Sequence, residues 1–156
     1  MNQGTDQNFG LKYQGIRNVL LVEDDLTATE MVRVIFAKMQ NDSTTDTVQY
    51  YALWEVNNGK SAVQTLREMP YDLILLDISL PIMSGFEVLV FVRAMHIYTP
   101  IFMFSSSNDI LDVHKAYDLG ANGFILKSEG RRQIELRIRA VCDCYFNYLL
   151  LPCPLY

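Results

Sequence analysis

The segment that most constrains the fold is Leu73-Ile-Leu-Leu76, an uninterrupted apolar run that stops at a carboxylate, Asp77. A short apolar run of this kind predicts a strand buried on both faces, as in a parallel sheet with helices on either side. A second run, from Asn18 to Val22, stops in the same way at Glu23-Asp24-Asp25. Because ligands of such sheets bind beyond the carboxyl ends of the strands, both acidic segments are candidates for one site.

A strand followed by a helix recurs along the whole chain. We expect strands at about 17–23, 48–54, 73–77, 100–105 and 123–127. We expect helices at about 26–39, 59–68, 85–96, 109–119 and 130–150, the third with Phe86, Leu89, Val90 and Met95 facing inward and the fourth capped by Asn108 or Asp109. Right-handed crossovers then predict an α/β fold, a doubly wound five-stranded parallel sheet of order 2-1-3-4-5, in which the ends of the first, third and fourth strands converge.

The converging acidic ends would bring three or four carboxylates into one pocket. Crowded carboxylates repel one another, so their pKa values rise unless a cation neutralises them. Oxygen-only ligands in a site with room for water suit Mg2+. The alternative is that Asp24, Asp25 and Asp77 only cap the loops after the strands, which is common for an isolated Asp. Two strand-terminal clusters in one short chain favour the metal site.

Two further strand ends carry groups that complement an acidic metal site. The segment 100–104 leads into Ser105, and the segment 123–126 leads into Lys127. A hydroxyl and an ammonium beside a metal are what a phosphoryl group needs, because its oxygens accept hydrogen bonds and carry negative charge. Taken singly, a Ser at a strand end is usually a turn residue and a Lys there is usually solvated.

In chain order, these strand ends resemble the receiver domain of two-component response regulators, over about residues 17–150. The resemblance implies that Asp77 is the phosphoacceptor and that Glu23 and Asp24 hold Mg2+ together with it. It also implies that Lys127 pairs with the phosphoryl oxygens and that Ser105 is the switch hydroxyl. All these roles come from the resemblance and not from the spacing alone.

Smaller features of the family are also present. The loop Pro81-Ile-Met-Ser-Gly85 and the turn Gly120-Ala-Asn-Gly123 are similar to its patterns. The resemblance places Phe124 at the aromatic switch position and makes the backbone carbonyl of Ser79 a further metal ligand.

Two positions near the site depart from a simple reading of the family pattern. Asp25 lies one position past the metal-binding pair, so we expect it to cap the following helix. Ser128 stands where many receivers have Pro, often after a cis peptide bond, and a cis bond at a residue other than Pro is costly. We therefore expect the loop that carries Lys127 either to differ in conformation from that of those receivers or to be more mobile.

The resemblance implies a receiver domain of the flavodoxin-like fold at 16–151, followed by a tail at 152–156. Residues 1–15 are rich in Asn, Gln and Gly and have few apolar side chains, so we expect a flexible lead there. The function it implies is that of a single-domain response regulator. Asp77 would accept a phosphoryl group from a sensor histidine kinase in a Mg2+-dependent phosphorelay, and the protein would signal by conformational change. It would not be an enzyme beyond its own phosphotransfer and dephosphorylation.

Two other functions use a similar arrangement. The first is a receiver-fold adaptor that acts without phosphorylation, against which the full set of site residues argues. The second is a phosphatase of the haloacid dehalogenase kind, which also has a strand-terminal Asp and Mg2+. That family needs a second Asp two residues after its nucleophile, and here the position is Ser79.

Composition agrees with one acidic globular domain. The chain has 156 residues, half of them hydrophobic, and a formal net charge of -5, which argues against a general nucleic-acid surface. No signal segment and no apolar run long enough to span a membrane is present in the sequence, so we expect a cytoplasmic protein without membrane contact. Cys142, Cys144 and Cys153 lack the spacing of a zinc site, and we expect reduced thiols.

The expected fifth helix has more apolar surface than one packed face requires. One stripe should pack on the sheet: Ile134, Ile138, Val141, Tyr145 and Tyr148. Further apolar residues cover most of the remaining circumference: Phe146, Leu149, Leu150 and Leu151. Either the tail at 152–156 folds back over them or a second subunit does, and we favour a homodimer through this helix. A long aromatic last helix is also similar to stand-alone receivers that serve phytochrome-type sensor kinases.

Overall fold

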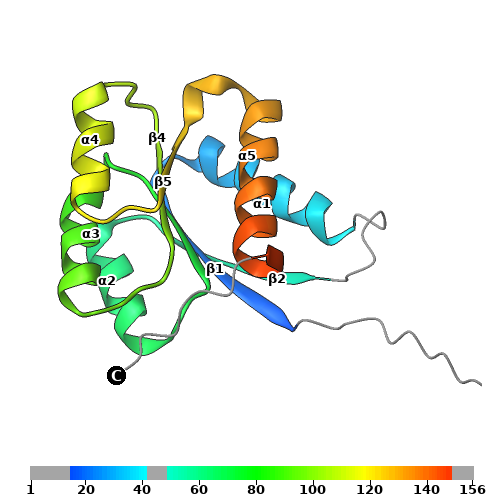
Figure 1. Ribbon diagram of the computed structural model, residues 1–156, viewed down its shortest axis with the longest axis horizontal. Coiled ribbons are helices and arrows are strands. Elements are labelled where there is room, and N and C mark those ends of the chain that lie inside the picture. The colour runs from blue at the N-terminus through cyan, green and yellow to red at the C-terminus, as the bar shows by residue number, and fades with distance from the viewer. Residues whose placement is uncertain (1–14, 42–48, 149–156) are drawn as a thin grey trace, which may run out of the picture.

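The computed structural model describes residues 15–41 and 49–148, with the backbone alone at Asn147 and Tyr148 (Figure 1). The expected tail at 152–156 and, apart from Gly15, the expected lead at 1–15 lie outside these residues. Within the described part, no helix is both long and apolar enough to cross a membrane.

One parallel sheet forms the centre of the described structure. Its strands are β1 (Ile16–Val22), β2 (Tyr50–Val56), β3 (Leu73–Leu76), β4 (Ile101–Ser105) and β5 (Gly123–Leu126), in the order β2-β1-β3-β4-β5. The predicted fold class and strand order are therefore confirmed. β2 extends two residues past the predicted end at 54, because Glu55 and Val56 still pair with Leu21 and Val22 of β1. The predicted start of this strand, at 48, lies outside the described residues.

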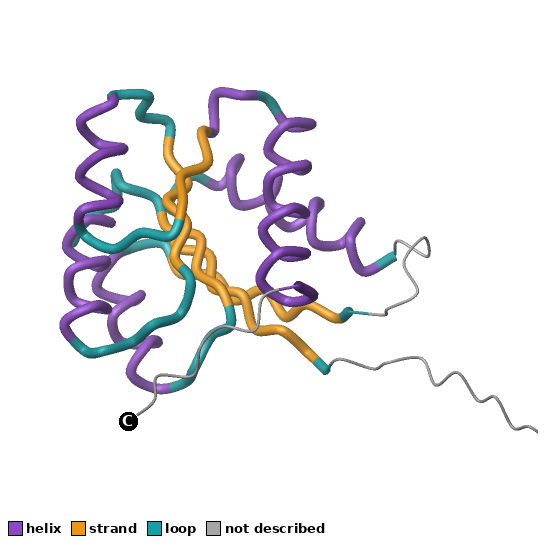
Figure 2. Tube along the Cα trace, viewed as in Figure 1, coloured by secondary structure: helices purple, strands orange, loops and turns teal. Residues whose placement is uncertain are grey.

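Helices cover both faces of the sheet (Figures 1 and 2). They are α1 (Leu26–Gln40), α2 (Gly59–Glu68), α3 (Gly85–Ala94), α4 (Ile110–Asp118) and α5 (Arg131–Asp143). α1 and α5 lie on one face, and α2, α3 and α4 lie on the other. The last helix is shorter than the predicted 130–150, because its regular part ends at Asp143 and continues as a π-helical segment, Cys144–Tyr148.

The alternation of side chains along each strand divides the core into two parts. In β3, Leu73 and Leu75 pack with residues of α1 and α5, whereas Ile74 and Leu76 pack with residues of α2 and α3. Burial on both faces explains why this strand is apolar without interruption.

On the face of the sheet covered by α2, α3 and α4, the helices bury different amounts of apolar side chain. α3 buries Val88, Leu89 and Val92, whereas Ala116 is the one buried residue among the nine of α4. The inward face predicted for α3 was partly wrong, because Val90 and Met95 are exposed. Since α3 is apolar on nearly every side, its periodicity does not define which side faces the sheet.

Side-chain caps fix the helix starts next to the carboxyl ends of the strands. Asp25 accepts a hydrogen bond from Thr27 N–H and Asp109 accepts one from Leu111 N–H, as predicted for Asp25 and for one of the two candidates at α4. Ser84 and Glu87 form a reciprocal capping box at α3.

The end of the last helix also differs from the prediction. Tyr145 packs on the core, as expected, but Phe146 does so too: its ring lies 6.1 Å from that of Tyr51 and 5.2 Å from the guanidinium carbon of Arg17. Phe146 is therefore covered in part by its own domain. Leu149, Leu150 and Leu151 lie outside the described residues.

The described cysteines lie at the end of α5 and at the start of the π-helical segment. Cys142 and Cys144 are free thiols, and burial raises the pKa of Cys142.

Candidate functional site

The candidate site lies where the carboxyl ends of β1, β3, β4 and β5 meet. Backbone hydrogen bonds fix the relative positions of its acidic residues: Glu23 N–H donates to Val56 O and Asp77 N–H donates to Val22 O, each at 3.0 Å. Glu23, Asp77 and Ser105 are all buried there, although each is polar or charged. Such burial is costly unless partners compensate for lost hydration, which makes this place in the fold a candidate functional site.

Three carboxylates meet at this point. Glu23, Asp24 and Asp77 each offer an oxygen, and these oxygens lie within 4.8 Å of one another. The donor set fits Mg2+, because all its atoms are carboxylate oxygens and the exposed Asp24 leaves one side open for water. Asp25 does not join the cluster: its carboxylate caps α1, while its N–H donates to Glu23 Oε1 at 3.1 Å.

Lys127 provides the positive charge in the site. Its Nζ lies 2.5 Å from Glu23 Oε2 and 3.1 Å from Asp77 Oδ2. Burial raises the pKa of Glu23 above its ordinary value, and Lys127 opposes that rise only in part. One ammonium therefore bridges the two buried carboxylates and offsets their repulsion.

The Asp77 carboxylate is held at both oxygens. Oδ1 accepts a hydrogen bond from Ile78 N–H at 2.8 Å, and Oδ2 faces Lys127. The following loop folds back closely, since Gly85 N–H donates to Ile78 O at 2.9 Å. A Cβ at Gly85 would lie 1.9 Å from the Asp77 carbonyl oxygen, so only glycine fits there. Ser79 is exposed in this loop, and its carbonyl as a metal ligand stays a prediction.

The same loop contains a strained residue that the sequence did not indicate. Ile82 has φ of 71°, in the left-handed region, and its side chain is 78% exposed. A β-branched residue at positive φ is a clear outlier, and such strain often occurs at functional sites. No sequence signal could have identified it, because Ile is among the residues least suited to this conformation.

Ser105 is engaged with the next loop and not with Asp77. Its Oγ accepts a hydrogen bond from Ser107 N–H at 3.2 Å. Ser107 Oγ in turn donates to Asp112 Oδ2 of α4 at 2.5 Å and accepts from Asp109 N–H at 3.3 Å. The predicted switch hydroxyl is thus linked to the start of α4 through Ser107. The sequence analysis did not identify Asp112 as part of this connection.

Phe124 and the loop after Lys127 complete the site. Phe124 lies opposite Met103 in the β4–β5 register and packs, partly buried, against the core on the α2, α3 and α4 side. Lys127 begins a short 3-10 helix, Lys127–Glu129. All peptide bonds of the described residues are trans, including the bond between Lys127 and Ser128.

The structure therefore brings together Glu23, Asp24, Asp77 and Lys127, and it places Ser105 and Phe124 on the neighbouring strands. The predicted helix-cap role of Asp25 is also confirmed. What the sequence analysis missed is the support around this set, at Ile82 and Asp112.

Comparisons with known proteins agree with this geometry. The family model of the response regulator receiver domain matches residues 19–139. The DNA-binding transcriptional activator EvgA of Escherichia coli K12 is 30% identical over 135 residues, which cover 85% of this chain and 62% of EvgA. The chain thus spans less than two thirds of that relative's length.

Two solved structures share the fold. The phosphorylated cyanobacterial phytochrome response regulator RcpA has a TM-score of 0.76 and 26% identity, over 89% of this chain and all of that one. The Mn(2+)-bound form of response regulator Rcp1 has a TM-score of 0.71 and 22% identity, over 88% of this chain and 99% of that one.

Proposed function

Since the chain belongs to the response regulator receiver family, we propose that Asp77 accepts a phosphoryl group from a sensor histidine kinase in a reaction that depends on Mg2+. The observation that carries the proposal is the position of the Asp77 carboxylate, which lies in the acidic cluster and 3.1 Å from the Lys127 ammonium. Residues 16–151 would form the receiver domain. The kinase would contribute the phosphohistidine.

Each residue of the site would have a separate role in phosphoryl transfer. An Asp77 oxygen forms the new O–P bond while the N–P bond of the phosphohistidine breaks and its electron pair stays on the imidazole nitrogen. Mg2+, held by Glu23, Asp24, Asp77 and the Ser79 carbonyl, would neutralise charge on the phosphoryl oxygens. Lys127 would shift from the carboxylates to a phosphoryl oxygen, where it makes a charge-assisted hydrogen bond.

Ser105 and Phe124 would convert phosphorylation into a change of surface. Ser105 would release Ser107 N–H and turn its hydroxyl to the phosphoryl group, and Phe124 would move into the space that Ser105 leaves. Because Ser107 is bonded to Asp112, this exchange would loosen the start of α4. To invert a 1:99 equilibrium, the phosphorylated site must favour the active state by about 5.5 kcal/mol.

The homodimer predicted through the last helix stays a proposal, with a revised contact surface. Phe146 is partly covered by its own domain, so it supports a dimer less than expected. Other apolar side chains on α4 and α5 are exposed and would form the contact: Ile110, Leu111, Tyr117 and Leu136. Phosphorylation would act on this surface through α4.

The partner kinase is proposed from the similarity to RcpA. That protein is a phytochrome response regulator, and we infer that a phytochrome-type sensor kinase is the partner to test first. EvgA is a DNA-binding activator, but the acidic charge of this chain, -5, gives no support to nucleic-acid binding by the receiver itself.

The decisive experiment is phosphorylation with acetyl phosphate and Mg2+, followed by intact-mass measurement. We expect the wild type to gain the mass of one phosphoryl group and Asp77→Asn to gain none. Asp25→Asn is the matched control, because it changes a nearby carboxylate that caps α1, and it should still be labelled. Labelling of Asp77→Asn would refute the site. No labelling of a folded wild type would favour the phosphorylation-independent adaptor.

A further inference from the structure

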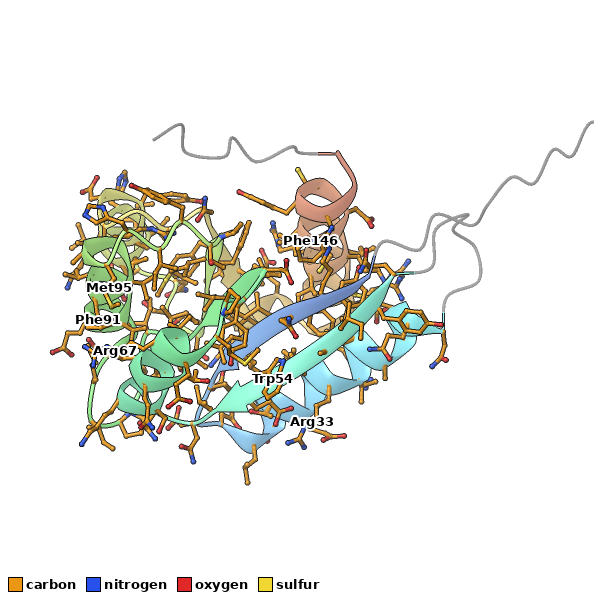
Figure 3. The ribbon with its side chains drawn as sticks, turned by 90° about the horizontal axis from the view of Figure 1, so that it is seen from below. Arg33, Trp54, Arg67, Phe91, Met95 and Phe146 are labelled. Atoms are coloured by element: carbon orange, nitrogen blue, oxygen red, sulfur yellow. The ribbon has the colours of Figure 1, made fainter. Side chains whose placement is uncertain are left out.

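β2 forms one edge of the sheet. It has seven residues and pairs along its whole length with β1, its one partner within residues 15–41 and 49–148. Figure 3 shows β2 in front of β1, with Trp54 on the strand and Arg33 of α1 beside it. A strand at an edge presents backbone N–H and C=O groups that can pair with another chain.

Two hydrogen bonds identify which groups of β2 point outward. Val56 O accepts from Glu23 N–H, so Val56 faces β1. Tyr51 O instead accepts from the side chain of Gln40 at the end of α1. Successive residues of a strand direct their backbone N–H and C=O groups to opposite sides. The backbone groups of Tyr51, Leu53 and Glu55 therefore point away from β1, to the open edge. None of the described residues provides a backbone partner for these three.

The strand lacks two of the usual features that keep an edge from pairing. Natural edges are often short or carry Lys or Pro, but the sequence Tyr50-Tyr-Ala-Leu-Trp-Glu-Val56 contains neither. Its single charge, on Glu55, is neutralised by Arg33, whose Nε and Nη2 lie 2.7 and 2.6 Å from the two carboxylate oxygens. Neither strand length nor charge therefore opposes a second strand.

Exposed apolar side chains adjoin the open edge. Tyr51 and Leu53 pack into the core beside α1 and α5. On the opposite face of the β1–β2 pair, Trp54 is 46% exposed, Tyr50 44% and Ile16 59%. Trp54 has two polar and aromatic neighbours in its own domain: Nε1 donates to Asn18 Oδ1 at 3.1 Å, and the ring centroid lies 6.4 Å from that of Tyr71. The edge and this face together form one surface, the β2 edge surface.

We propose that the β2 edge surface binds the same surface of a second copy of this chain, by antiparallel pairing of the two β2 strands about a two-fold axis at Leu53. This register pairs every residue of the strand. The backbone of Leu53 meets that of Leu53 of the partner subunit, and the backbone of Tyr51 meets that of Glu55 of the partner subunit, with about two hydrogen bonds for each such pair. The pairs at Tyr51 form once the Gln40 side chain releases Tyr51 O.

The side chains favour a second copy over an unrelated strand. In this register, the large Trp54 lies opposite the small Ala52 of the partner subunit, and Tyr50 lies opposite Val56 of the partner subunit. Glu55 lies opposite a Tyr and not another carboxylate, so the pairing brings no like charges face to face. The strand is thus complementary to itself in size and free of like-charge repulsion in this register. The result would be one continuous sheet through two subunits.

This contact is separate from the proposed phosphorylation and from the dimer through α4 and α5. β2 and β5 lie at opposite edges of the sheet, and α4 and α5 flank β5 in Figure 1. The proposal does not depend on whether Asp77 is phosphorylated. Its test must therefore distinguish this contact from any other self-association.

Amide hydrogen exchange of the full chain by NMR, at micromolar and near-millimolar concentration, makes this distinction. Pairing should slow exchange at Leu53 and Glu55 by about tenfold or more at the higher concentration. The amides of Ala52 and Trp54 face β1 and should be protected at both concentrations. Trp54 is the single Trp, so its fluorescence should shift to shorter wavelength as the dimer forms.

Two edge variants and one control complete the test. Trp54→Lys and, independently, Tyr50→Lys should remove the concentration dependence of exchange at Leu53 and Glu55. Tyr98→Lys changes a Tyr that is exposed elsewhere, before β4, and should keep it. Circular dichroism checks that each variant is folded. A chain that is monomeric at the higher concentration, or one that associates without slower exchange at Leu53 and Glu55, overturns the proposal.

Discussion

Replacing Ile82 by Asn should stabilise the protein, although it removes an apolar side chain. Ile82 adopts φ of 71°, and the left-handed conformation costs a residue other than Gly roughly 1–2 kcal/mol. Asn tolerates this conformation better than any β-branched residue does, because its side chain can bond locally. Most of that cost should therefore be relieved.

The loss of apolar burial is small by comparison. Burying a whole Ile side chain is worth about 1.5–3 kcal/mol, but Ile82 is 78% exposed, so roughly a fifth of this value is at stake. The expected balance is a gain of about 0.5–1 kcal/mol. For a domain of this size that raises the melting temperature by about 1–4 °C.

Ile110→Asn is the matched control. Ile110 is also largely exposed, at 61%, but it begins the α-helix α4 and carries no positive φ. Its replacement relieves no strain and should leave stability unchanged or lower it slightly. Urea unfolding and thermal melts of both variants and the wild type give the comparison. If Ile82→Asn is no more stable than Ile110→Asn, the positive φ of Ile82 does not destabilise the folded protein as we infer.

Three further changes test the site more directly. Gly85→Ala should lower the free energy of unfolding by about 3 kcal/mol or more, because the new Cβ would lie 1.9 Å from Asp77 O; urea unfolding measures this, and a variant as stable as wild type would contradict it. Burial raises the pKa of Glu23 above its ordinary value of 4.5. Glu23 therefore contributes its full stabilisation below pH 4.5, and this contribution is lost as the pH rises through the raised pKa. Glu23→Gln should flatten this loss and be more stable than wild type at pH 7 without Mg2+, as urea titrations across pH would show; equal pH profiles would refute it. Asp24→Asn should weaken Mg2+ binding in calorimetry far more than Asp25→Asn, which changes only a cap; equal losses would show that both residues hold the ion.

The convergence of the site could be predicted because it follows from chain direction. Strands that run parallel place their carboxyl ends at one edge, so apolar runs ending at Glu23, Asp77, Ser105 and Lys127 had to bring these residues near one another. The burial of β3 on both faces and the capping role of Asp25 follow from equally local rules.

The sequence predictions failed where the local sequence does not determine the direction of a side chain or the backbone conformation. α3 is apolar on nearly every side, so Val90 could not be assigned outward from its spacing. Phe146 falls in the π-helical segment after Asp143, where the wider turn changes the direction of each side chain from that of a regular helix. The positive φ of Ile82 follows from the path of the loop and runs against the preference of its own side chain.

On the face of the sheet that carries α2, α3 and α4, α3 is held firmly by buried side chains and α4 is held weakly. The buried Val88, Leu89 and Val92 of α3 each contribute about 1.5–3 kcal/mol of apolar burial. α4 has Ala116 alone in that class, whose methyl contributes about 0.8 kcal/mol. A movement at Ser105 therefore displaces α4 much further than it displaces α3. The compliance of the domain is concentrated in the helix whose first turn is bonded, through Asp112, to the loop after Ser105.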